Sequence, residues 1–599
     1  MADGQPGRSL CRRSVLKMGA AAAAATLSGG RPLRAVERAT SREATDADDH
    51  KRPNILFVFS DQHRWCSLPF TGMPRQVAPN FSRMARGGTS FDNCISTNPI
   101  CVPYRGMLIT GMWPHQSGIV GNHYFRDEDI VGVDAPTIAH TFRDGGYTAG
   151  YVGKWHLKTL GNKTMYQAGF DYFKHWQWGD NHWETKVRDI PSHGDYSVHE
   201  GYNAIGMTDQ ALDFMREHAH DEAPFLMMLS WNPPHWRWDD APEEYLKLYP
   251  PGEIDWRPNV ADAWKSGRQL DYYRHYHAHV TAIDAQMGRI LEELEGMGIA
   301  DNTVVIYTSD HGSCLGSHGL GGKFNPYDES IRVPFFVRWP GRVPAGRRDD
   351  TPIGAIDIYP TLCGLAGIEP PEFCGGRDLS HLLLGRDGYA PDAQLIMIAN
   401  SPGYFFDRVS GEVADSALPP FRGVRTRRYT YTVGGEGEWQ LYDNAEDPYQ
   451  MHNLVEDPAH AELRRSLRAR LDELLREAED PFISEQWLKL DLPDRIRREN
   501  QFYALEGPTW RWDKYKNEVL SAHLQEGLSD RQRARLKAAA DEVFDGDFFA
   551  LYWGLERRID RMGNHRPERA KELKDRQSRH EREHRDRFER RAQTILQGE

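Results

Sequence analysis

Apolar residues gather in continuous runs along the first two thirds of the chain, and amphipathic segments separate these runs. A strand buried on both faces of a sheet shows such a run, whereas a half-exposed strand alternates apolar and polar residues. Four runs therefore predict buried parallel strands, and each ends in polar residues: PNILFVFSDQ (53–62), TAGYVGKWH (148–156), PFLMMLSWNPPH (224–235) and NTVVIYTSDHG (302–312).

The segments between these runs have helical periodicity. Examples are TIAHTFRDGG (137–146) and YHAHVTAIDAQMGRILEELEGMG (276–298), and we expect the second helix to end at Gly298. Strands that alternate with helices predict an α/β fold with a doubly wound sheet, in which ligands bind beyond the carboxyl ends of the strands. Four polar residues are expected at these ends: Asp61, Lys154, His235 and Asp310.

The pattern changes near residue 402. FRGVRTRRYTYTVGG (421–435) and GEWQLYDN (437–444) predict antiparallel strands, and a charged helix is expected over about 458–479. We therefore predict four parts, which are a signal and linker (1–50), a catalytic α/β domain (51–401), a smaller α+β subdomain (402–490) and a charged helical extension (491–599). The extension is interpreted as a solvated helix, with an interaction arm as the alternative.

Composition narrows the class of protein. A chain of 599 residues with 39% hydrophobic residues is long enough for more than one folded unit. Its net charge of −13 argues against a nucleic-acid partner, because binding phosphates needs a basic surface. The seven cysteines have no C-x-x-C spacing, so neither a zinc site nor a disulfide framework is predicted.

The N-terminus contains a segment that resembles a targeting signal, CRRSVLKMGAAAAAATLSGG (11–30). Paired arginines before a short apolar stretch resemble a twin-arginine export signal, although Cys11 stands where serine or threonine is usual. The alternative is a basic, alanine-rich helix without targeting function. We expect an exported protein, periplasmic or secreted, without a membrane-spanning helix.

Two pairs of residues at strand ends predict a metal site. Asp61 and Gln62 end the first strand, and Asp310 and His311 end the last one. Carboxylate and amide oxygens suit Ca²⁺, Mg²⁺ or Mn²⁺, and the imidazole favours Mn²⁺. The alternative is that each aspartate caps the following helix.

Basic side chains follow the other strand ends. Lys154 and His156 lie in GKWH, His235 in NPPHW and Lys323 in GLGGKF, all beside glycine or proline turns. Cationic groups that face a metal ion suit a tetrahedral oxyanion ester, because negative charge develops on its oxygens and leaving group during cleavage. A single histidine in such a turn would be more often structural.

The segment NPICVPYRGMLITG (98–111) contains Cys101 two residues before Pro103 and four before Arg105. This C-x-P-x-R sequence resembles the signature of type I sulfatases, in which the cysteine is oxidised to formylglycine. The strand at 53–62 and the GKWH, NPPH, TSDHG, GGK, YDESIRVP and LYDNAEDPYQMHNL motifs follow in the order of that family. The resemblance covers about residues 53–457.

The resemblance implies an alkaline-phosphatase-like fold with a large mixed, mostly parallel sheet, and a sulfatase activity that depends on formylglycine and one divalent cation, Ca²⁺ foremost. It also implies a formylglycine-generating enzyme as a transient partner. Cys101 would become the nucleophile and Arg105 would hold its hydrated aldehyde. The other implied roles are sulfate binding by Lys154 and Lys323, proton donation by His235 and proton acceptance by His156.

Two features depart from the common pattern of the family. Tyr104 stands where serine or alanine is usual, so the efficiency of formylglycine formation is open. The Asp-Gln and Asp-His pairs resemble the branch of choline sulfatases and phosphonate monoester hydrolases, in which an asparagine contacts the transferred group; Asn122 in IVGNHY matches it. The GKWH motif, in contrast, is the commoner sulfatase form.

Tryptophans cluster near the predicted site and suggest the substrate. They lie in KHWQWGDNHW (174–183) and PPHWRWDD (233–240). Aromatic faces can stack on sugar rings or bind a quaternary ammonium, and the alternative is that they only pack loops together. We expect a sulfated carbohydrate or other sulfated small molecule. The rival functions are choline-sulfate, phosphodiester or phosphonate monoester hydrolysis, and non-catalytic binding with an unmodified Cys101.

Overall fold

The computed structural model describes residues 52–117, 119, 121–122, 136–157, 159–160, 163–164, 168–176, 181–190, 196–398, 405–407, 412–414, 421–434, 437–480, 530–543 and 567–597. The predicted signal and linker (1–50) lie outside these residues. No helix in the described part of the chain is long and apolar enough to cross a membrane.

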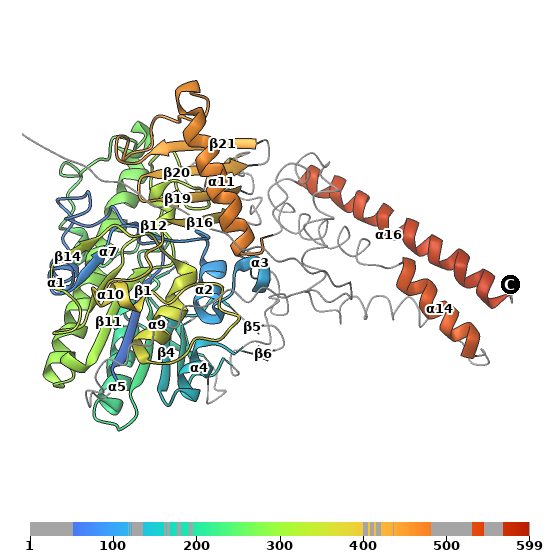
Figure 1. Cartoon of the computed structure of the whole chain (residues 1–599). Coiled ribbons are helices and arrows are strands. Elements are labelled where there is room, and N and C mark those ends of the chain that lie inside the picture. Colours follow the sequence, from blue (N-terminus) through green and yellow to red (C-terminus); the bar gives the residue numbers. More distant parts are fainter. Residues whose placement is uncertain are drawn as a thin grey trace, which may run out of the picture. The chain divides into compact units, whose positions relative to one another are not determined.

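A ten-stranded sheet forms the centre of the fold (Figure 1). Its strands, in spatial order, are β14 (Arg347–Asp349), β2 (Thr89–Phe91), β13 (Phe336–Arg338), β11 (Thr303–Ser309), β1 (Asn54–Ser60), β10 (Phe225–Ser230), β4 (Thr148–Lys154), β7 (Tyr172–Trp176), β8 (Thr185–Asp189) and β9 (Ser197–His199). The five strands from β11 to β7 are parallel, and the pairs β11–β13, β13–β2, β7–β8 and β8–β9 are antiparallel. The sheet is therefore mixed and mostly parallel at its centre, as expected.

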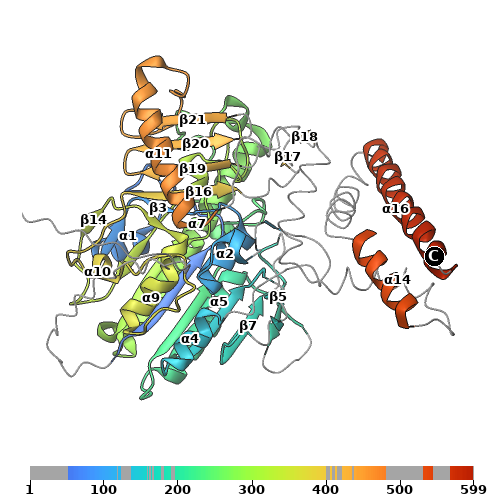
Figure 2. The same ribbon diagram turned by 45° about the vertical axis from the view of Figure 1, so that its right-hand side comes forward.

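The sheet is buried on both faces, and β1 shows why its sequence is continuously apolar. Ile55, Phe57 and Phe59 belong to one core, whereas Leu56 and Val58 belong to another. The first core lies under α2 (Cys101–Thr110), α4 (Ile138–Asp144) and α9 (Ile358–Ala366), and the second under α1 (Pro79–Arg86), α5 (Asn203–His218) and α7 (Gly267–Gly296). In Figure 2, α4 and α9 lie along one face of the strands.

Helix α7 is longer than the sequence predicts. It begins at Gly267, nine residues before the predicted segment, because Tyr272 and Tyr273 extend the buried stripe toward the N-terminus. The helix ends at Gly296, and Gly298 follows with a φ of +71°, the left-handed conformation that glycine adopts without strain.

The C-terminal subdomain is a four-stranded antiparallel sheet packed on one helix (Figure 1). Its strands are β16 (Ala393–Ile398), β19 (Phe421–Thr426), β20 (Tyr429–Gly434) and β21 (Gly437–Asp443), and α11 spans Ala461–Glu477. The small sheet begins earlier in the chain than the predicted boundary at residue 402. Its first strand is β16, whose six residues are all buried and pair with β19.

The remaining elements are short or belong to the extension. The extension contains α14 (Asp530–Val543) and α16 (Pro567–Leu596), which contact each other. The short helices are α3 (Pro114–Ser117), α6 (Glu243–Leu246), α8 (Asp328–Ile331) and α10 (Ser380–Leu383). The small strand groups are β12 (Arg332–Val333), β3 (Cys94–Ile95) and β15 (Ile353–Gly354), the pair β5 (Thr159–Leu160) and β6 (Lys163–Thr164), and the pair β17 (Phe405–Asp407) and β18 (Glu412–Ala414).

Candidate active site

The register of β1 and β11 brings the two predicted metal pairs together. Ser60 lies opposite Ser309 in this parallel pairing, so the residues that follow, Asp61 and Asp310, leave the sheet side by side. The backbone N–H of Gln62 donates to Asp310 Oδ1 at 3.1 Å and closes the two strand ends onto each other. Two aspartates 249 positions apart in the sequence thus face one space.

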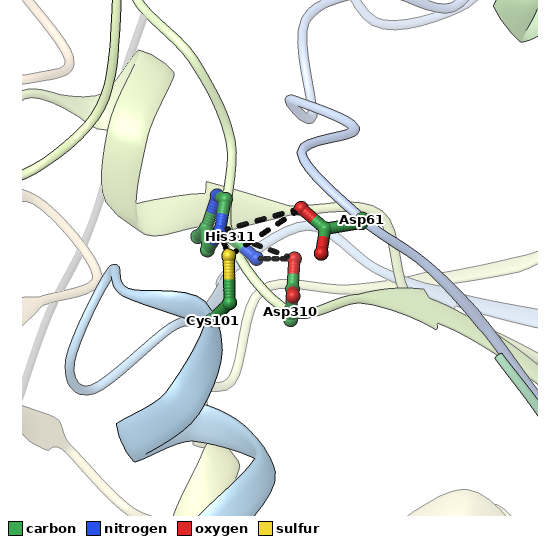
Figure 3. A group of neighbouring side chains, drawn as sticks. All are labelled: Asp61, Cys101, Asp310 and His311. Carbon is green, nitrogen blue, oxygen red and sulfur yellow. Dashed lines mark hydrogen bonds and ion pairs between the residues drawn. The ribbon is translucent and has the colours of Figure 1, made fainter. Parts of the chain in front are cut away.

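Helix α2 delivers Cys101 to that space from the other side. The helix begins at Cys101, and all ten of its residues are buried. Cys101 Sγ lies 3.1 Å from His311 Nε2 and 3.7 Å from Asp61 Oδ1, and these side chains point toward one another with Asp310 (Figure 3). The first turn is closed by Asn122, whose Oδ1 accepts the N–H of Val102 at 2.9 Å.

The converging donor atoms fit a divalent cation. Ligand atoms of Asp61, Cys101, Asp310 and His311 lie within 4.8 Å of one another, and all four residues are buried. Two buried carboxylates at such close range repel each other, so a cation between them is favourable. The amide of Gln62 donates through Nε2 to Ser313 Oγ at 3.1 Å, and Gln62 has a φ of +74°, a conformation that non-glycine residues adopt at a cost.

Three cationic side chains surround the carboxylates. Lys154 Nζ lies 2.5 Å from Asp61 Oδ2, and Arg105 bridges Asp61 and Asp310 at 3.1 and 3.2 Å. Lys323 Nζ lies 3.0 Å from Cys101 Sγ and 2.8 Å from His311 Nε2. All three cationic residues were predicted for the site from the sequence, and the structure brings them together although they come from three separate segments.

The two predicted proton-transfer histidines lie at the edge of this group. His235 Nε2 is 3.9 Å from Asp61 Oδ1. Burial, together with the charge of Lys154, holds the pKa of His235 and of His156 well below the usual value, so both rings are neutral near pH 7. His156 has a φ of +60°, and it follows the strand end that carries Lys154.

Electrostatic interactions within this group lower the pKa of the Cys101 thiol and shift the pKa values of the two carboxylates in opposite directions. Burial and Asp61 act to raise the pKa of Cys101, but Lys323, Lys154 and His311 outweigh them and hold it below the usual value. Burial and the neighbouring Asp61 raise the pKa of Asp310. Burial acts likewise on Asp61, but Lys154 and other cations lower its pKa well below the usual range. Such opposed shifts are typical of catalytic clusters.

Two residues around Arg105 were not predicted from the sequence. Ser230 Oγ accepts from Arg105 at 2.8 Å and donates to the Lys154 carbonyl at 2.9 Å, and the Tyr151 hydroxyl donates to the same carbonyl at 2.5 Å. Ser230 ends β10, the strand beside β1. Its position at a strand end was the signal that could have identified it.

Tyr104, which lies between Pro103 and Arg105, is a core residue. Its side chain extends from α2 into the apolar cluster that α2 shares with α9, and burial raises the pKa of its hydroxyl well above the usual value. The side chain at this position therefore packs inward.

The tryptophans divide into packed and exposed residues. Trp176 and Trp238 are buried in the cores, so their contribution is structural. Trp183 is 37% exposed, and Trp236 is partly buried beside His235. Trp178 lies outside the described residues.

Comparison with known proteins identifies the family. The Sulfatase family model matches residues 53–368, and the model of the C-terminal region of N-sulphoglucosamine sulphohydrolase matches residues 316–477. An ulvan-active sulfatase from Formosa agariphila is 30% identical over 485 residues, which cover 79% of this chain and 90% of the relative. An endo-4-O-sulfatase from Bacteroides thetaiotaomicron is 29% identical over 504 residues, covering 75% and 96%.

Solved structures show the same fold. A sulfatase structure from work on glycosaminoglycan metabolism by Bacteroides thetaiotaomicron superposes with a TM-score of 0.63 at 29% identity and covers 72% of this chain and 97% of its own. A sulfatase structure from Bacteroides fragilis superposes with a TM-score of 0.62 at 27% identity and covers 75% and 100%. The chain therefore belongs to the sulfatase family of the alkaline-phosphatase superfamily, and it is a sulfatase that hydrolyses sulfate esters.

Proposed function

We propose that this sulfatase cleaves sulfate monoesters of carbohydrates with a formylglycine nucleophile made from Cys101. The observation that supports the nucleophile most is the position of Cys101 Sγ, 3.1 Å from His311 and 3.0 Å from Lys323, among ligands for a cation. Carbohydrate is favoured because the matched relatives include sulfatases named for ulvan and for N-acetylglucosamine-6-O-sulfate.

The cation is proposed to be Ca²⁺, held by Asp61, Gln62, Asp310 and His311. An oxygen-rich set with two carboxylates favours Ca²⁺ over transition metals, and Mg²⁺ and Mn²⁺ are the alternatives. When bound, the cation supplies Lewis-acid activation of the nucleophile and neutralises charge on the sulfate.

Four residues are proposed to orient the reactants. Arg105, fixed by Ser230 and both aspartates, holds the hydrated aldehyde. Lys154 and Lys323 bind sulfate oxygens, and their charges stabilise the negative charge that develops there. Asn122 contacts the transferred group in the related branch; in this chain its Oδ1 accepts the N–H of Val102, so we assign it the positioning of α2 as well.

The two histidines are proposed to move the protons. The hydrated aldehyde supplies an attacking hydroxyl and a second hydroxyl that permits release of sulfate. His156, neutral in the buried site, accepts the proton of the second hydroxyl. His235 donates a proton to the departing sugar oxygen, which requires that the negative charge of bound sulfate raise its pKa.

Maturation and export are proposed to follow a fixed order. If residues 1–50 act as a twin-arginine signal, the chain crosses the membrane folded, and Cys101 is then already buried. A formylglycine-generating enzyme must therefore act in the cytoplasm before export. Protein isolated from the cytoplasm before export should carry the aldehyde.

Two measurements test the proposal. Mass spectrometry of the peptide that contains Cys101 should show the aldehyde in protein produced with a formylglycine-generating enzyme, and a thiol that remains alkylatable would contradict the mechanism. Parallel assays with a sulfated sugar, an aryl phosphate and a phosphodiester should show preference for the sulfate ester. Preference for the diester would favour a phosphodiester or phosphonate monoester hydrolase instead.

A further inference from the structure

A second cluster of potential metal ligands is separate from the catalytic group, which is the cluster of Asp61, Cys101, Asp310 and His311 with the cationic side chains around it. His182 comes from the segment before β8, Asp240 from the segment after β10, and His279 from α7. His182 Nδ1 lies 2.7 Å from Asp240 Oδ1, and His279 Nε2 lies 3.4 Å from the same oxygen. The ligand atoms of all three residues lie within 4.8 Å of one another.

The cluster is buried and its rings are held in place. Both histidines are inaccessible to solvent, while the Asp240 side chain is 17% exposed. The Tyr202 hydroxyl bonds to His279 Nδ1 at 2.7 Å, which orients the ring so that Nε2 faces Asp240. An outer partner on the second ring nitrogen is characteristic of histidines that bind metal ions.

The distances around His279 Nε2 are long for hydrogen bonds and match the spacing of zinc ligands. This nitrogen faces two oxygens, Asp240 Oδ1 at 3.4 Å and the Arg237 carbonyl at 3.3 Å. An N–H···O hydrogen bond is usually about 2.9 Å long. Neighbouring ligands of a tetrahedral zinc ion, with bonds of about 2.0–2.1 Å, are separated by about 3.3 Å.

The contact between His182 and Asp240 is the shorter one. Their 2.7 Å separation is a hydrogen-bond distance and must open by about 0.6 Å around a tetrahedral ion.

We propose that His182, Asp240 and His279 bind a zinc ion that fixes the segment after β10 to α7. Two imidazoles and one carboxylate form a set that suits zinc, unlike the oxygen-rich catalytic set. The Arg237 carbonyl or a solvent molecule completes the coordination. The segment fixed in this way, residues 231–240, also carries His235.

The test counts zinc in protein whose catalytic cluster cannot bind it. A C101S/H311A background removes the thiol and the imidazole that lie between Asp61 and Asp310, and excess Ca²⁺ occupies the two carboxylates that remain. After removal of free metal, plasma mass spectrometry should find one zinc per chain. Adding His279→Ala or His182→Ala should weaken zinc binding at least tenfold.

A control variant and a spectroscopic readout complete the test. His275→Ala changes a histidine on the same helix, whose Nδ1 accepts the N–H of Ala241 at 3.1 Å, and should retain the zinc. Cobalt in place of zinc should give the intense visible bands of a tetrahedral site, and these should be lost in the nearly isosteric Asp240→Asn. Binding is compared only among variants with unchanged circular dichroism.

The opposite results would overturn the proposal. If the C101S/H311A protein binds no stoichiometric zinc, or if folded Asp240→Asn binds zinc and cobalt as tightly as its parent, the three residues form a hydrogen-bonded cluster only. Zinc loss in His275→Ala equal to that in His279→Ala would equally contradict assignment of the site to these ligands.

Discussion

Two buried groups of charged residues in this protein differ in how they are paired. At the junction of the large domain and the small sheet, Arg425 contacts both oxygens of Asp328 at 3.0 and 2.9 Å, and Arg257 pairs with Glu329 at 3.1 Å. Each carboxylate there has an arginine at close range, and Asp328 has a second one, Arg332, at 3.5 Å. In the catalytic group, Lys154, Lys323 and Arg105 converge on two aspartates and a thiol.

This difference in pairing distinguishes charged residues that stabilise the fold from charged residues that are proposed to act in catalysis. A buried charge that is fully paired contributes to stability only while both partners are present. The catalytic group concentrates cations around groups that approach one another, and the pKa values of Asp61 and Asp310 move in opposite directions. Under the proposed function these charges serve an anionic substrate and a cation, so their interaction with each other need not be optimal for stability.

The largest expected effect is on the catalytic side. Cys101→Ser should lower kcat by about 10⁴-fold or more, because serine offers only one hydroxyl and cannot release sulfate after the first transfer. Thermal unfolding should change little, because the substitution nearly conserves volume. Steady-state kinetics measure kcat, and calorimetry measures the unfolding temperature. If Cys101→Ser keeps a tenth of the activity, Cys101 is not the source of the nucleophile.

The second largest effect is expected at the junction of the large domain and the small sheet. There a substitution should lower stability and leave activity almost unchanged. Arg425→Met removes the closer of the two arginine partners of the buried Asp328 and leaves only Arg332, at 3.5 Å, so it should lower the free energy of unfolding by about 3 kcal/mol. Activity per folded molecule should change less than about twofold. Arg428→Met is the control, because the half-exposed Arg428, at the turn between β19 and β20, pairs with Asp443 near the surface, and its loss should have little effect on stability. Equal losses in both variants would contradict the assignment.

A smaller effect should depend on the leaving group. His235→Gln should reduce kcat on a sugar sulfate by about 10²-fold, because a sugar alkoxide needs a proton as it departs. The loss should be only a few-fold on 4-nitrophenyl sulfate, whose leaving group is stable as an anion. Comparing both substrates with one enzyme preparation provides the internal control, and equal losses would assign His235 to positioning instead of proton donation.

The smallest effect concerns a carboxylate outside both groups. Asp284 on α7 accepts the backbone N–H groups of Asn80 and Phe81, and burial raises its pKa to about 6. The folded state therefore holds the proton to a higher pH than the unfolded chain does. The stability that Asp284 contributes is present at low pH and is lost as the pH rises from about 4 to 6.

Asp284→Asn should consequently destabilise the protein more at pH 5 than at pH 7, by about 1 kcal/mol. Denaturant unfolding of both proteins at the two pH values measures the difference. A destabilisation that grows with pH would show that the Asp284 pKa is not raised.

Local sequence was enough to predict the core of the site. Asp61 and Asp310 follow apolar runs, and parallel strands end at one edge of a sheet, so their proximity follows from the pattern. The roles of Cys101, Arg105 and Lys323 came from resemblance to a family. Ser230 was missed because serine at a strand end is common, and only the packing of β10 beside β1 shows that it holds Arg105.

The sequence by itself determined the buried strands, the main helices and the motif around Cys101, because apolar periodicity and C-x-P-x-R are local patterns. Tertiary structure alone decided the rest. Ala78 cannot cap α1, and the cap comes from Asp284 some 200 residues later. Pairings such as Arg425 with Asp328, or His182 with Asp240 and His279, depend on the register of distant strands and helices, and no local pattern encodes that distance.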